Sequence, residues 1–531
     1  SDVYKRQPYY YGIKGGSYNP SNPTDYEIER LGTSGTDYLK TSDISKASDQ
    51  TFYLDARVNY DRQFNLHHVT GMLMYMQREY RSSVLPERNQ GFSGRFTYDY
   101  GQRYLVELNF GYNGTERLAK KDRFDFSPAV SLGWVISNEK FFEPMTKYID
   151  NLKIRGSYGL VGSDETGLSA GAQHFLYIDQ VSLNNIGFTT GVDMNYTLYG
   201  PLVTNYAVVN GGWERVKKLD IGIDLELFRQ LTITADYFNE KRYNILLHRE
   251  AWPESLGYYT AKPWSNKGKV DNWGIELSVN WRKEFTKDLY VDFRGNFTYT
   301  ENKYVNLDEP VYPYVWKTST GKPLSRTTGY IAQGLFSSQE EIDNSPTQNL
   351  GSTVKPGDIK YRDVNGDGKI DGSDQVMISP YGTTPRIQYG LGMNVTYKKF
   401  DFGVFFNGSA KRTIMISGIS PFGQSDYNVM QFIADDYWSE SNPNPNAKYP
   451  RLGLTSSQTA NNTVASTYWM RNGNFIRFKT LELGYKFKYG RVYLNGDNIA
   501  VFSPFKLWDP ELSWNAYPLQ RTFNIGVQLN F

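Results

Sequence analysis

The sequence has no cysteine, which excludes disulfides, thiolate metal sites and thiol catalysis. Its four histidines form no HExxH pattern and no arrangement typical of a zinc site or a histidine-dependent triad. Carboxylates are plentiful, but they are scattered over alternating segments, so no pair is singled out for glycoside hydrolysis. We therefore predict that the chain is not an enzyme.

Long apolar runs are also missing: nowhere do 18 consecutive apolar residues occur, so no membrane-spanning helix is expected. Neither sign of charge dominates, because 58 basic and 56 acidic residues leave a net charge of +2, which does not indicate a nucleic-acid binder. The mean hydropathy of −0.58 would suit a soluble protein. A low mean hydropathy does not exclude a transmembrane β-barrel, however, because only every second residue of its strands faces lipid.

What the sequence has in abundance is aromatic residues, at 16%, and alternation of apolar with polar residues. From Leu219 to Leu227 the odd positions are apolar and the even positions are polar or glycine, as in a strand with two different faces. A short turn at Phe228-Arg229 leads into a second alternating segment, which predicts a hairpin. Fifteen strands are predicted in this way: 51–62, 68–81, 91–100, 103–113, 124–136, 150–158, 214–227, 230–239, 272–282, 288–300, 385–397, 400–410, 475–487, 491–499 and 521–531.

The connections between these segments alternate too, mostly short after the odd-numbered strands and usually much longer after the even-numbered ones. Outer-membrane barrels have short periplasmic turns and long extracellular loops, so the rhythm favours an all-β, antiparallel transmembrane barrel. Closed barrels of this kind normally have an even number of strands, so an odd count predicts that strands are missing on the N-terminal side. Residues 1–7 are predicted to be non-native, residues 8–531 to be a partial barrel, and 301–384 to be an extracellular loop insert.

Several motifs follow one another along the chain: Pro356-Gly-Asp-Ile-Lys-Tyr361, Asn446-Ala-Lys-Tyr-Pro-Arg451 and Tyr468-Trp-Met-Arg-Asn-Gly-Asn-Phe-Ile-Arg-Phe-Lys479. In this order they resemble SusC/RagA-type TonB-dependent transporters, and the resemblance covers nearly the whole chain from about residue 51. It implies the last fifteen strands of a 22-stranded outer-membrane barrel, with the plug domain absent from this chain.

The same resemblance implies TonB-dependent import of oligosaccharides or peptides. The implied partners are a SusD-like surface lipoprotein, the TonB complex acting through the missing N-terminal part, outer-membrane lipid, and the barrel-assembly machinery, for which Phe531 would be the C-terminal signal. Two alternatives stay open, a passive porin and a surface β-rich carbohydrate-binding protein.

One further motif, residues 363–374, fits a calcium-binding loop with a glycine at its sixth position. Its alternative is a tight Asp/Asn/Gly-rich turn without metal. The expected ligands are Asp363, Asn365, Asp367, the Lys369 carbonyl, Asp371 and Asp374.

Two other groups of side chains are candidates for substrate contact. The loop aromatics could stack on sugars or contact a partner, but packing within the loop itself is favoured. The acids at polar strand positions could form a substrate path or simply line water. The two groups are Tyr304, Tyr312, Tyr314, Trp316, Tyr330 and Phe336, and Asp220, Asp224, Glu226, Asp236 and Glu276.

Overall fold

The computed structural model describes residues 10–14, 27–31, 48–82, 86–165, 176–208, 211–256, 262–416, 429–453, 456–513 and 516–530. The chain divides into two compact units. One takes the residues up to Leu54 together with Gln77–Arg88 and contains the small hairpin of β1 (Tyr10–Ile13) and β2 (Ile28–Leu31). The other takes Asp55–Met76 and Asn89–Phe531, and the candidate sites described below belong to it.

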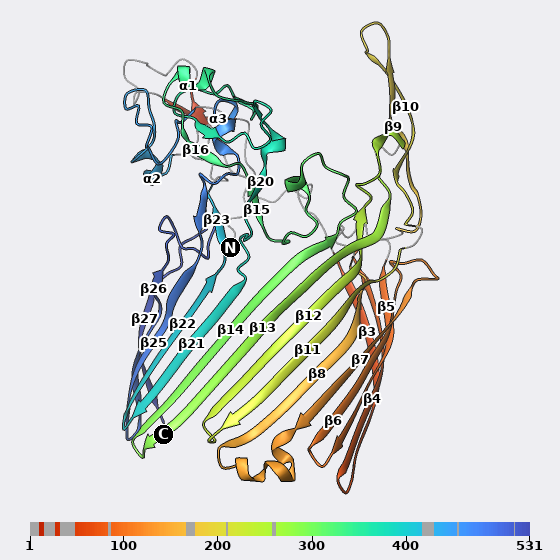
Figure 1. The fold of residues 1–531 in the computed structure, drawn as a ribbon, viewed down its shortest axis with the longest axis vertical. Helices are drawn as coiled ribbons and strands as arrows, with labels where there is room; N and C mark the ends of the chain where they lie inside the picture. The colour runs from red at the N-terminus through yellow and green to blue at the C-terminus, as the bar shows by residue number, and fades with distance from the viewer. Residues whose placement is uncertain are drawn as a thin grey trace. The chain divides into compact units, whose positions relative to one another are not determined.

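A single antiparallel sheet of fifteen strands dominates the fold, and each strand in it pairs with its neighbours in the chain (Figure 1). Each of the fifteen predicted segments corresponds to one strand of this sheet, which confirms the predicted fold class. The strands are β3 (Gln50–Phe64), β4 (His67–Arg81), β5 (Glu87–Tyr100), β6 (Tyr104–Thr115), β7 (Phe124–Val135), β8 (Ile149–Ser163), β11 (Glu214–Leu227), β12 (Leu231–His248), β13 (Trp264–Thr286), β14 (Leu289–Asn306), β21 (Ile387–Tyr397), β22 (Phe400–Ala410), β25 (Phe475–Phe487), β26 (Gly490–Phe502) and β27 (Thr522–Leu529).

The segments predicted for β12, β13 and β14 were shorter than the strands observed. Their pairing continues past the alternating stretch, for instance where Lys241 lies opposite Asp271. Strand pairing is made by backbone hydrogen bonds and does not require side chains to alternate. Outside the apolar stretch, these strands therefore continue through a charged sequence without alternation.

The connections at the two ends of the sheet differ in length, as predicted. Six of the seven connections at one end have two or three residues, and the seventh contains the 3-10 helices η3 (Ile136–Asn138) and η4 (Lys140–Met145). We call this the short-turn end; it is the lower end in Figure 1. The long-loop end carries the connections 82–86, 116–123, 164–213, 249–263, 307–386, 411–474 and 503–521.

The two faces of the sheet differ in polarity. Large side chains on one face are exposed, as in β27, where Phe523, Ile525 and Val527 are 63%, 81% and 61% exposed. We call this the apolar face and the opposite one the polar face. Apolar side chains that no other layer of the protein covers need an apolar surrounding, which a lipid bilayer supplies. The predicted C-terminal signal, Phe531, lies outside the described residues.

Three long connections fold together into what we call the loop domain, within 307–386, 411–474 and 503–513. Its core contains buried Tyr330, Ile359, Ile433, Trp469 and Phe505. The predicted insert 301–384 is therefore one of three contributors. Its elements are η7 (Val315–Lys317), β15 (Thr327–Gly329), β16 (Ala332–Leu335), α1 (Gln339–Asp343), β17 (Thr347–Gln348), β18 (Ile359–Tyr361), β19 (Lys369–Ile370), η8 (Gly372–Asp374), β20 (Val376–Ser379), β23 (Thr413–Met415), α2 (Gln431–Ala434), α3 (Ser456–Thr463) and β24 (Met470–Asn472).

The long connection between β8 and β11 contains a hairpin that was not predicted, formed by β9 (Gln180–Thr190) and β10 (Tyr196–Asn205). Its apolar residues do not alternate regularly, and its register shifts at three places, which explains why period-two analysis missed it. A short 3-10 helix, η6 (Glu254–Leu256), lies in the connection between β12 and β13. Within the part of the chain that the structure describes, no helix is long and apolar enough to cross a membrane.

Candidate functional site

On the polar face, three of the five predicted acids meet around one arginine. Arg155 of β8 lies 3.2 Å from Asp220, 3.2 Å from Asp224 and 2.6 Å from Asp236, measured between guanidinium nitrogens and carboxylate oxygens. The register explains the cluster, because Arg155 pairs with Gly222, and Gly222 pairs with Asp236 on the next strand. The absence of a side chain at position 222 lets Arg155 reach across β11 to β12.

The other two predicted acids do not join this ion-pair cluster. Glu276 lies directly opposite Asp236 in the register of β12 and β13, whereas Glu226 lies opposite Thr232 nearer the short-turn end. Sequence reasoning missed Arg155, although its position in the alternation of the predicted strand 150–158 places it on the polar face. The cluster is a fixed network of charges that faces away from the lipid-exposed surface.

Further along the same face, a cavity of about 680 Å³ lies near the long-loop end of β14, β21, β22 and β25. We call it the upper hollow. Its lining combines amides, hydroxyls and three charged groups with aromatic rings. Its lining includes Asn296, Thr383, Thr384, Gln388, Phe405, Asn407, Ser409, Arg412, Phe475, Lys479 and Glu511.

A second cavity of about 310 Å³, the lower hollow, follows on the same strands toward the short-turn end. Its wall contains Arg294, Asp401 and Glu482. Phe405 belongs to both cavities and separates them. Its cross-strand partner is Gly392, and a Cβ at Gly392 would lie in close contact with that ring, at 3.3 Å.

One charged group of the upper hollow, Glu511, is positioned by an ion pair with Arg477. Arg477, only 2% exposed, places Nη2 2.7 Å from Asp509 and 2.7 Å from Glu511, which ties the 503–513 connection to β25. Burial lowers the pKa of Arg412 below its ordinary value, and the nearby Glu511 and Asp509 oppose that shift. Both hollows offer donors, acceptors and an aromatic ring to a polar solute, without an arrangement that suggests catalysis.

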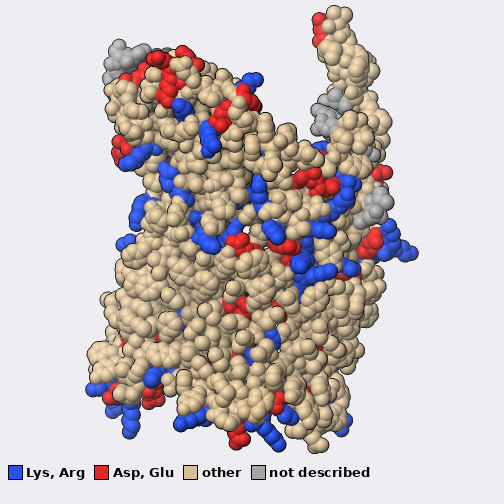
Figure 2. Space-filling model, viewed as in Figure 1, with Lys and Arg blue, Asp and Glu red and all other residues tan. Residues whose placement is uncertain are grey.

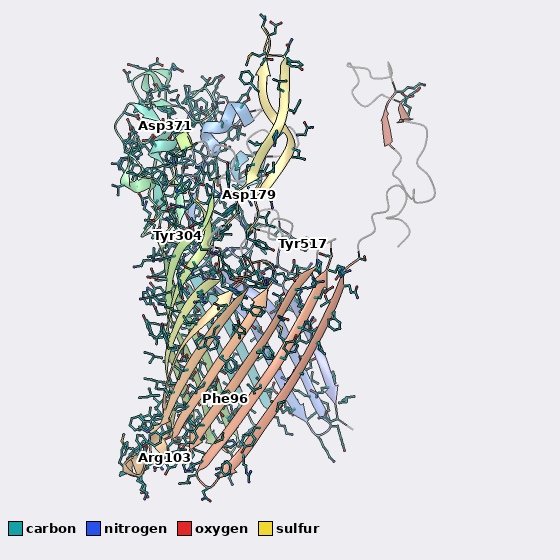
Figure 3. The ribbon with its side chains drawn as sticks, turned by 90° about the vertical axis from the view of Figure 1, so that its right-hand side faces the viewer. Phe96, Arg103, Asp179, Tyr304, Asp371 and Tyr517 are labelled. Atoms are coloured by element: carbon teal, nitrogen blue, oxygen red, sulfur yellow. The ribbon has the colours of Figure 1, made fainter. Side chains whose placement is uncertain are left out.

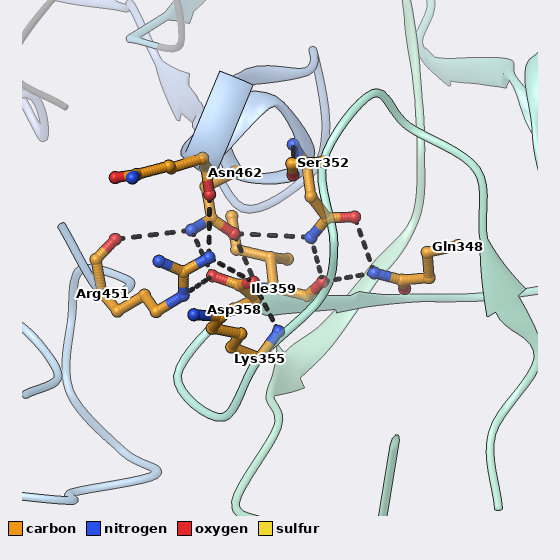
Figure 4. Close-up of polar contacts among 9 residues, drawn as sticks. Gln348, Ser352, Lys355, Asp358, Ile359, Arg451 and Asn462 are labelled. Carbon is orange, nitrogen blue, oxygen red and sulfur yellow. Dashed lines mark hydrogen bonds and ion pairs between the residues drawn. The ribbon is translucent and has the colours of Figure 1, made fainter. Parts of the chain in front are cut away.

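In the loop domain, two of the motifs noted in the sequence meet. Asp358 of the 356–361 motif is fully buried, and Arg451 of the 446–451 motif places Nε 2.7 Å from its carboxylate (Figure 4). Asn462 donates to the same carboxylate over 2.8 Å, and so does the backbone amide of Lys355. A buried carboxylate requires compensation of this kind, which explains why the motifs occur together.

The network continues through the asparagines of α3. The Ile359 amide donates to Asn462 Oδ1 over 2.9 Å, and Asn461 Nδ2 donates to the Ile359 carbonyl over 2.9 Å. Gln348 bridges the same strand, because its Oε1 accepts from the Tyr361 amide and its Nε2 donates to the Ile359 carbonyl. β18 pairs with β16, and these side chains satisfy further backbone groups of the strand, as buried peptide groups require.

Gly357 has φ +86°, a conformation that residues with a side chain rarely adopt. A Cβ there would lie 2.2 Å from the ring of Trp438. The carbonyl of Gly357 also accepts from the amide of Arg451 over 2.9 Å. The glycine therefore allows the two motifs to approach each other closely.

The predicted calcium loop is a compact turn held together by its own polar groups. Asp363 accepts from the amides of Gly366 (2.6 Å) and Gly368 (2.9 Å), and buried Asp374 accepts from those of Val364 (2.8 Å) and Asp371 (2.9 Å). The hydrogen bonds to Asp363 are those of a tight Asx-type turn, whereas Asp374 ties the end of the segment to its beginning.

The remaining proposed ligands also accept backbone amides. Asn365 Oδ1 accepts from the Asp367 amide and Asp367 Oδ1 from the Lys369 amide, while hydrogen bonds from Ser373 hold the pKa of Asp371 below its usual range. Among the described residues, no three His, Asp or Glu side chains are grouped so as to hold a metal. Calcium binding therefore stays a prediction.

Some of the loop aromatics pack as the favoured interpretation predicted. Tyr330 and Phe336 are buried, 3% and 1% exposed. The stacked rings of Tyr314 and Trp316, with centroids 4.8 Å apart, hold the 363–374 turn: Asn365 donates to the Tyr314 hydroxyl over 3.0 Å, and the Trp316 indole donates to the Ser373 carbonyl over 2.8 Å. Figure 3 places Tyr304 at the long-loop end of the sheet and Asp371 in the loop domain.

In the same connection, the carboxylate of Glu309 holds the turn at Ser319 and Thr320. It accepts from the amides of Ser319 and Thr320 over 2.8 and 2.9 Å, and from the Thr320 hydroxyl over 2.7 Å. Burial raises the pKa of Glu309, but these hydrogen bonds lower it more, so it lies below the ordinary value.

Comparison with known proteins agrees with this architecture. The family described as "TonB dependent receptor-like, beta-barrel" matches residues 2–499. The chain is 27% identical over 469 residues to the TonB-dependent receptor SusC of Bacteroides thetaiotaomicron, covering 83% of this chain and 43% of that protein. It is 25% identical over 478 residues to the TonB-dependent receptor P3 of Formosa agariphila, covering 82% of this chain and 45% of that one.

A solved structure, that of the RagAB peptide transporter, superposes on 91% of this chain and 55% of the other with a TM-score of 0.67 at 18% identity, which shows a common fold. The chain belongs to the TonB-dependent receptor family and forms part of its outer-membrane β-barrel, in a family of transporters and not of enzymes. Within that family it is SusC/RagA-like. It spans a little under half the length of the two relatives above.

Proposed function

We propose that this chain forms part of the wall of a TonB-dependent importer, and that its polar face guides a polar nutrient, an oligosaccharide or a peptide, across the outer membrane. The observation that carries the proposal is the succession of upper and lower hollows on one face of four adjacent strands. A solute with hydroxyl or amide groups could exchange hydrogen bonds along this row, and Phe405 offers a ring for stacking between the two positions.

The proposed partners are the TonB complex, which would supply energy, and a SusD-like surface lipoprotein at the long-loop end. Exposed apolar side chains at that end support a protein partner, since such patches mark interaction surfaces. Val311 and Val315 in the loop domain are almost fully exposed, and so are Leu183 and Val192 of the β9–β10 hairpin. A passive porin remains the alternative function.

The polar path is tested by obstructing it in the full-length protein. Gln388→Trp would place a large ring in the upper hollow, whereas Leu391→Trp on the same strand adds the same ring to the apolar face. Uptake of a panel of radiolabelled oligosaccharides and peptides is measured in cells that carry the full-length protein and its neighbouring lipoprotein. We expect uptake of the transported probe to fall at least tenfold with Gln388→Trp and to stay within twofold of the parent with Leu391→Trp.

Equal uptake by the parent and the Gln388→Trp protein would contradict the proposed path. Uptake that persists undiminished when TonB is deleted would contradict energy coupling and favour the porin.

A further inference from the structure

The guanidinium of Arg412, in the wall of the upper hollow, is a charge without a partner. Among the described residues, no carboxylate lies within ion-pair distance of it, and its Nε is buried without a hydrogen-bond acceptor. Glu511 and Asp509 attract it only from beyond that distance. Charged groups removed from bulk water are normally paired, because an uncompensated charge there is costly. The wall of the hollow therefore offers a cation to which the described part of the chain supplies no anion.

The carboxylates nearest to this cation are already engaged. Arg477 donates from Nε to Glu511 over 2.8 Å, and its Nη2 lies 2.7 Å from the same carboxylate. The same Nη2 contacts both oxygens of Asp509, at 2.7 and 2.8 Å. A buried arginine thus compensates both acids, and neither is free to move toward Arg412.

The backbone on both sides of Arg412 fixes its position. Its carbonyl accepts from the amide of Gly473 over 3.0 Å, and the next amide, that of Thr413, donates to the Gly382 carbonyl over 2.8 Å. A Cβ at Gly473 would lie 3.3 Å from Arg412 Cγ, so the stem of the arginine passes close to this glycine. Two connections of the loop domain therefore hold the arginine in place before a solute arrives, which lowers the entropic cost of binding.

Lys479 is a second basic group of the same wall. It is exposed, and it forms no ion pair within the part of the chain that the structure describes. Together with the supporting groups, three cations face two carboxylates: Arg412, Arg477 and Lys479 against Asp509 and Glu511. The walls of the hollow therefore keep one uncompensated positive charge.

Neighbouring basic groups do have partners. Lys411 lies 4.6 Å from the centre of the Tyr299 ring, and Arg386 lies 2.6 Å from Glu301. Figure 2 shows basic and acidic side chains next to each other over much of the long-loop end. The chain thus supplies partners for cations in this region, and Arg412 is left without one among the residues described.

We infer that the upper hollow binds the carboxylate of an acidic solute, with Arg412 as its main contact and Lys479 as a second positive charge. The inference rests on the proposed function, because it names the class of solute that the polar face would guide, an acidic oligosaccharide or an acidic peptide. A guanidinium presents its N–H groups in a planar fork that matches the two oxygens of a carboxylate.

The rest of the hollow suits the uncharged part of such a solute. Its volume of about 680 Å³ falls in the range of small-molecule sites. The Gln388 amide can exchange hydrogen bonds with hydroxyl or peptide groups, and the Phe405 ring can stack on a sugar or an apolar side chain. The carboxylate is therefore the group that the hollow selects, and both kinds of solute can carry it.

Binding is measured on the purified full-length protein with probes matched in pairs. The acidic probes are labelled uronate-containing trisaccharides and aspartate-containing tripeptides. Each is compared with its neutral counterpart, in which the carboxyl groups are reduced to alcohols or converted to amides. Arg412→Gln removes the charge at the hollow, and Arg362→Gln makes the same change at an exposed arginine of the loop domain outside the lining.

We expect the parent to bind at least one acidic probe more tightly than its neutral counterpart. Arg412→Gln should weaken binding of that probe by about tenfold or more, the value of a hydrogen bond to a charged group. The neutral counterparts should bind this variant and the parent alike, which a general disturbance of the hollow would not allow. Arg362→Gln should change neither affinity. A loss confined to the uronate pairs identifies a sugar, and one confined to the aspartate pairs identifies a peptide.

Two results would overturn the inference. Equal affinity of the parent for both members of every pair would refute the acidic class. Tighter binding of acidic probes that Arg412→Gln leaves unchanged would refute the site, because the anion would then bind elsewhere. Heat-modifiable migration verifies the folding of each variant. If Arg412→Gln does not fold, Lys479→Gln at its exposed position decides instead, and unchanged affinity for the acidic probes then refutes the site.

The binding site and the import path can fail separately. If Gln388→Trp blocks uptake while acidic and neutral probes bind the parent alike, the path is supported and the carboxylate site is refuted. If acidic probes bind through Arg412 while Gln388→Trp leaves uptake unchanged, the carboxylate site is supported and the path is refuted.

Discussion

Replacing Arg451 by methionine should open the loop domain, because it leaves the buried carboxylate of Asp358 without its cation. Asp358 is fully buried, and Arg451 supplies two of the polar contacts to its carboxylate, at 2.7 and 3.0 Å. Asn462 and the Lys355 amide supply the other two. Breaking a buried ion pair from one side costs about 3–5 kcal/mol. The double variant Arg451→Met with Asp358→Asn removes the unpaired charge as well and should cost only about 1–3 kcal/mol, the cost of leaving buried hydrogen-bonding groups unsatisfied.

The measurement is hydrogen exchange of the backbone amides of Ile359 and Tyr361 in the full-length protein, because both donate to side chains of the network. Where exchange reports the opening equilibrium, a loss of 3–5 kcal/mol accelerates it by a factor of about 100 to 4,000, since each 1.4 kcal/mol is tenfold. Amides of β21 should keep the rate of the parent and serve as the internal control.

The comparison of the two variants decides whether the reasoning is right. If the double variant exchanges as fast as Arg451→Met, or faster, the arginine does not compensate a buried charge, and the contribution of the pair has to be sought in packing alone. Unchanged exchange in both variants would show that the network does not stabilise β18.

Three further predictions concern the loops. Asp363→Ala combined with Asp367→Ala should abolish a calcium-dependent gain in protease resistance of residues 363–374, and a parent protein that shows no calcium effect would remove the proposed site. Gly357→Ala should destabilise the loop domain by at least about 1 kcal/mol, because of its positive φ and the tryptophan ring; Gly372→Ala, where a Cβ meets nothing within 4 Å, is the control, and equal melting of both would contradict this. The folded-state pKa of Glu309 is depressed, so its stabilisation should be complete above its unfolded pKa, about 4.3, and be lost as the pH falls through the folded pKa; amide exchange that does not accelerate with acid beyond its intrinsic pH dependence would refute this.

Sequence alone was enough for the membrane-spanning part, because its pattern is local. A strand between lipid and a polar interior must alternate, and a stretch such as Leu219 to Leu227 therefore carries the evidence for its own structure and orientation. The fifteen strands, their sequential pairing and the lengths of their connections all follow from that pattern. The family motif 356–361 could also be recognised in the sequence, but the buried contacts of its Asp358 could not be predicted from it.

Only the tertiary structure determined which residues from distant parts of the chain contact each other. Arg155 meets Asp236 because the register aligns both with Gly222 of the one strand between them, and Asp358 meets Arg451 across 93 residues. The two hollows are lined by residues of four strands and share Phe405. Contacts of this kind depend on register and loop packing, whose energies are shared among many residues, so no short segment of sequence determines them. The alternation in a segment indicates which of its faces contacts lipid. The packing of the whole chain determines which side chains contact each other on the other face.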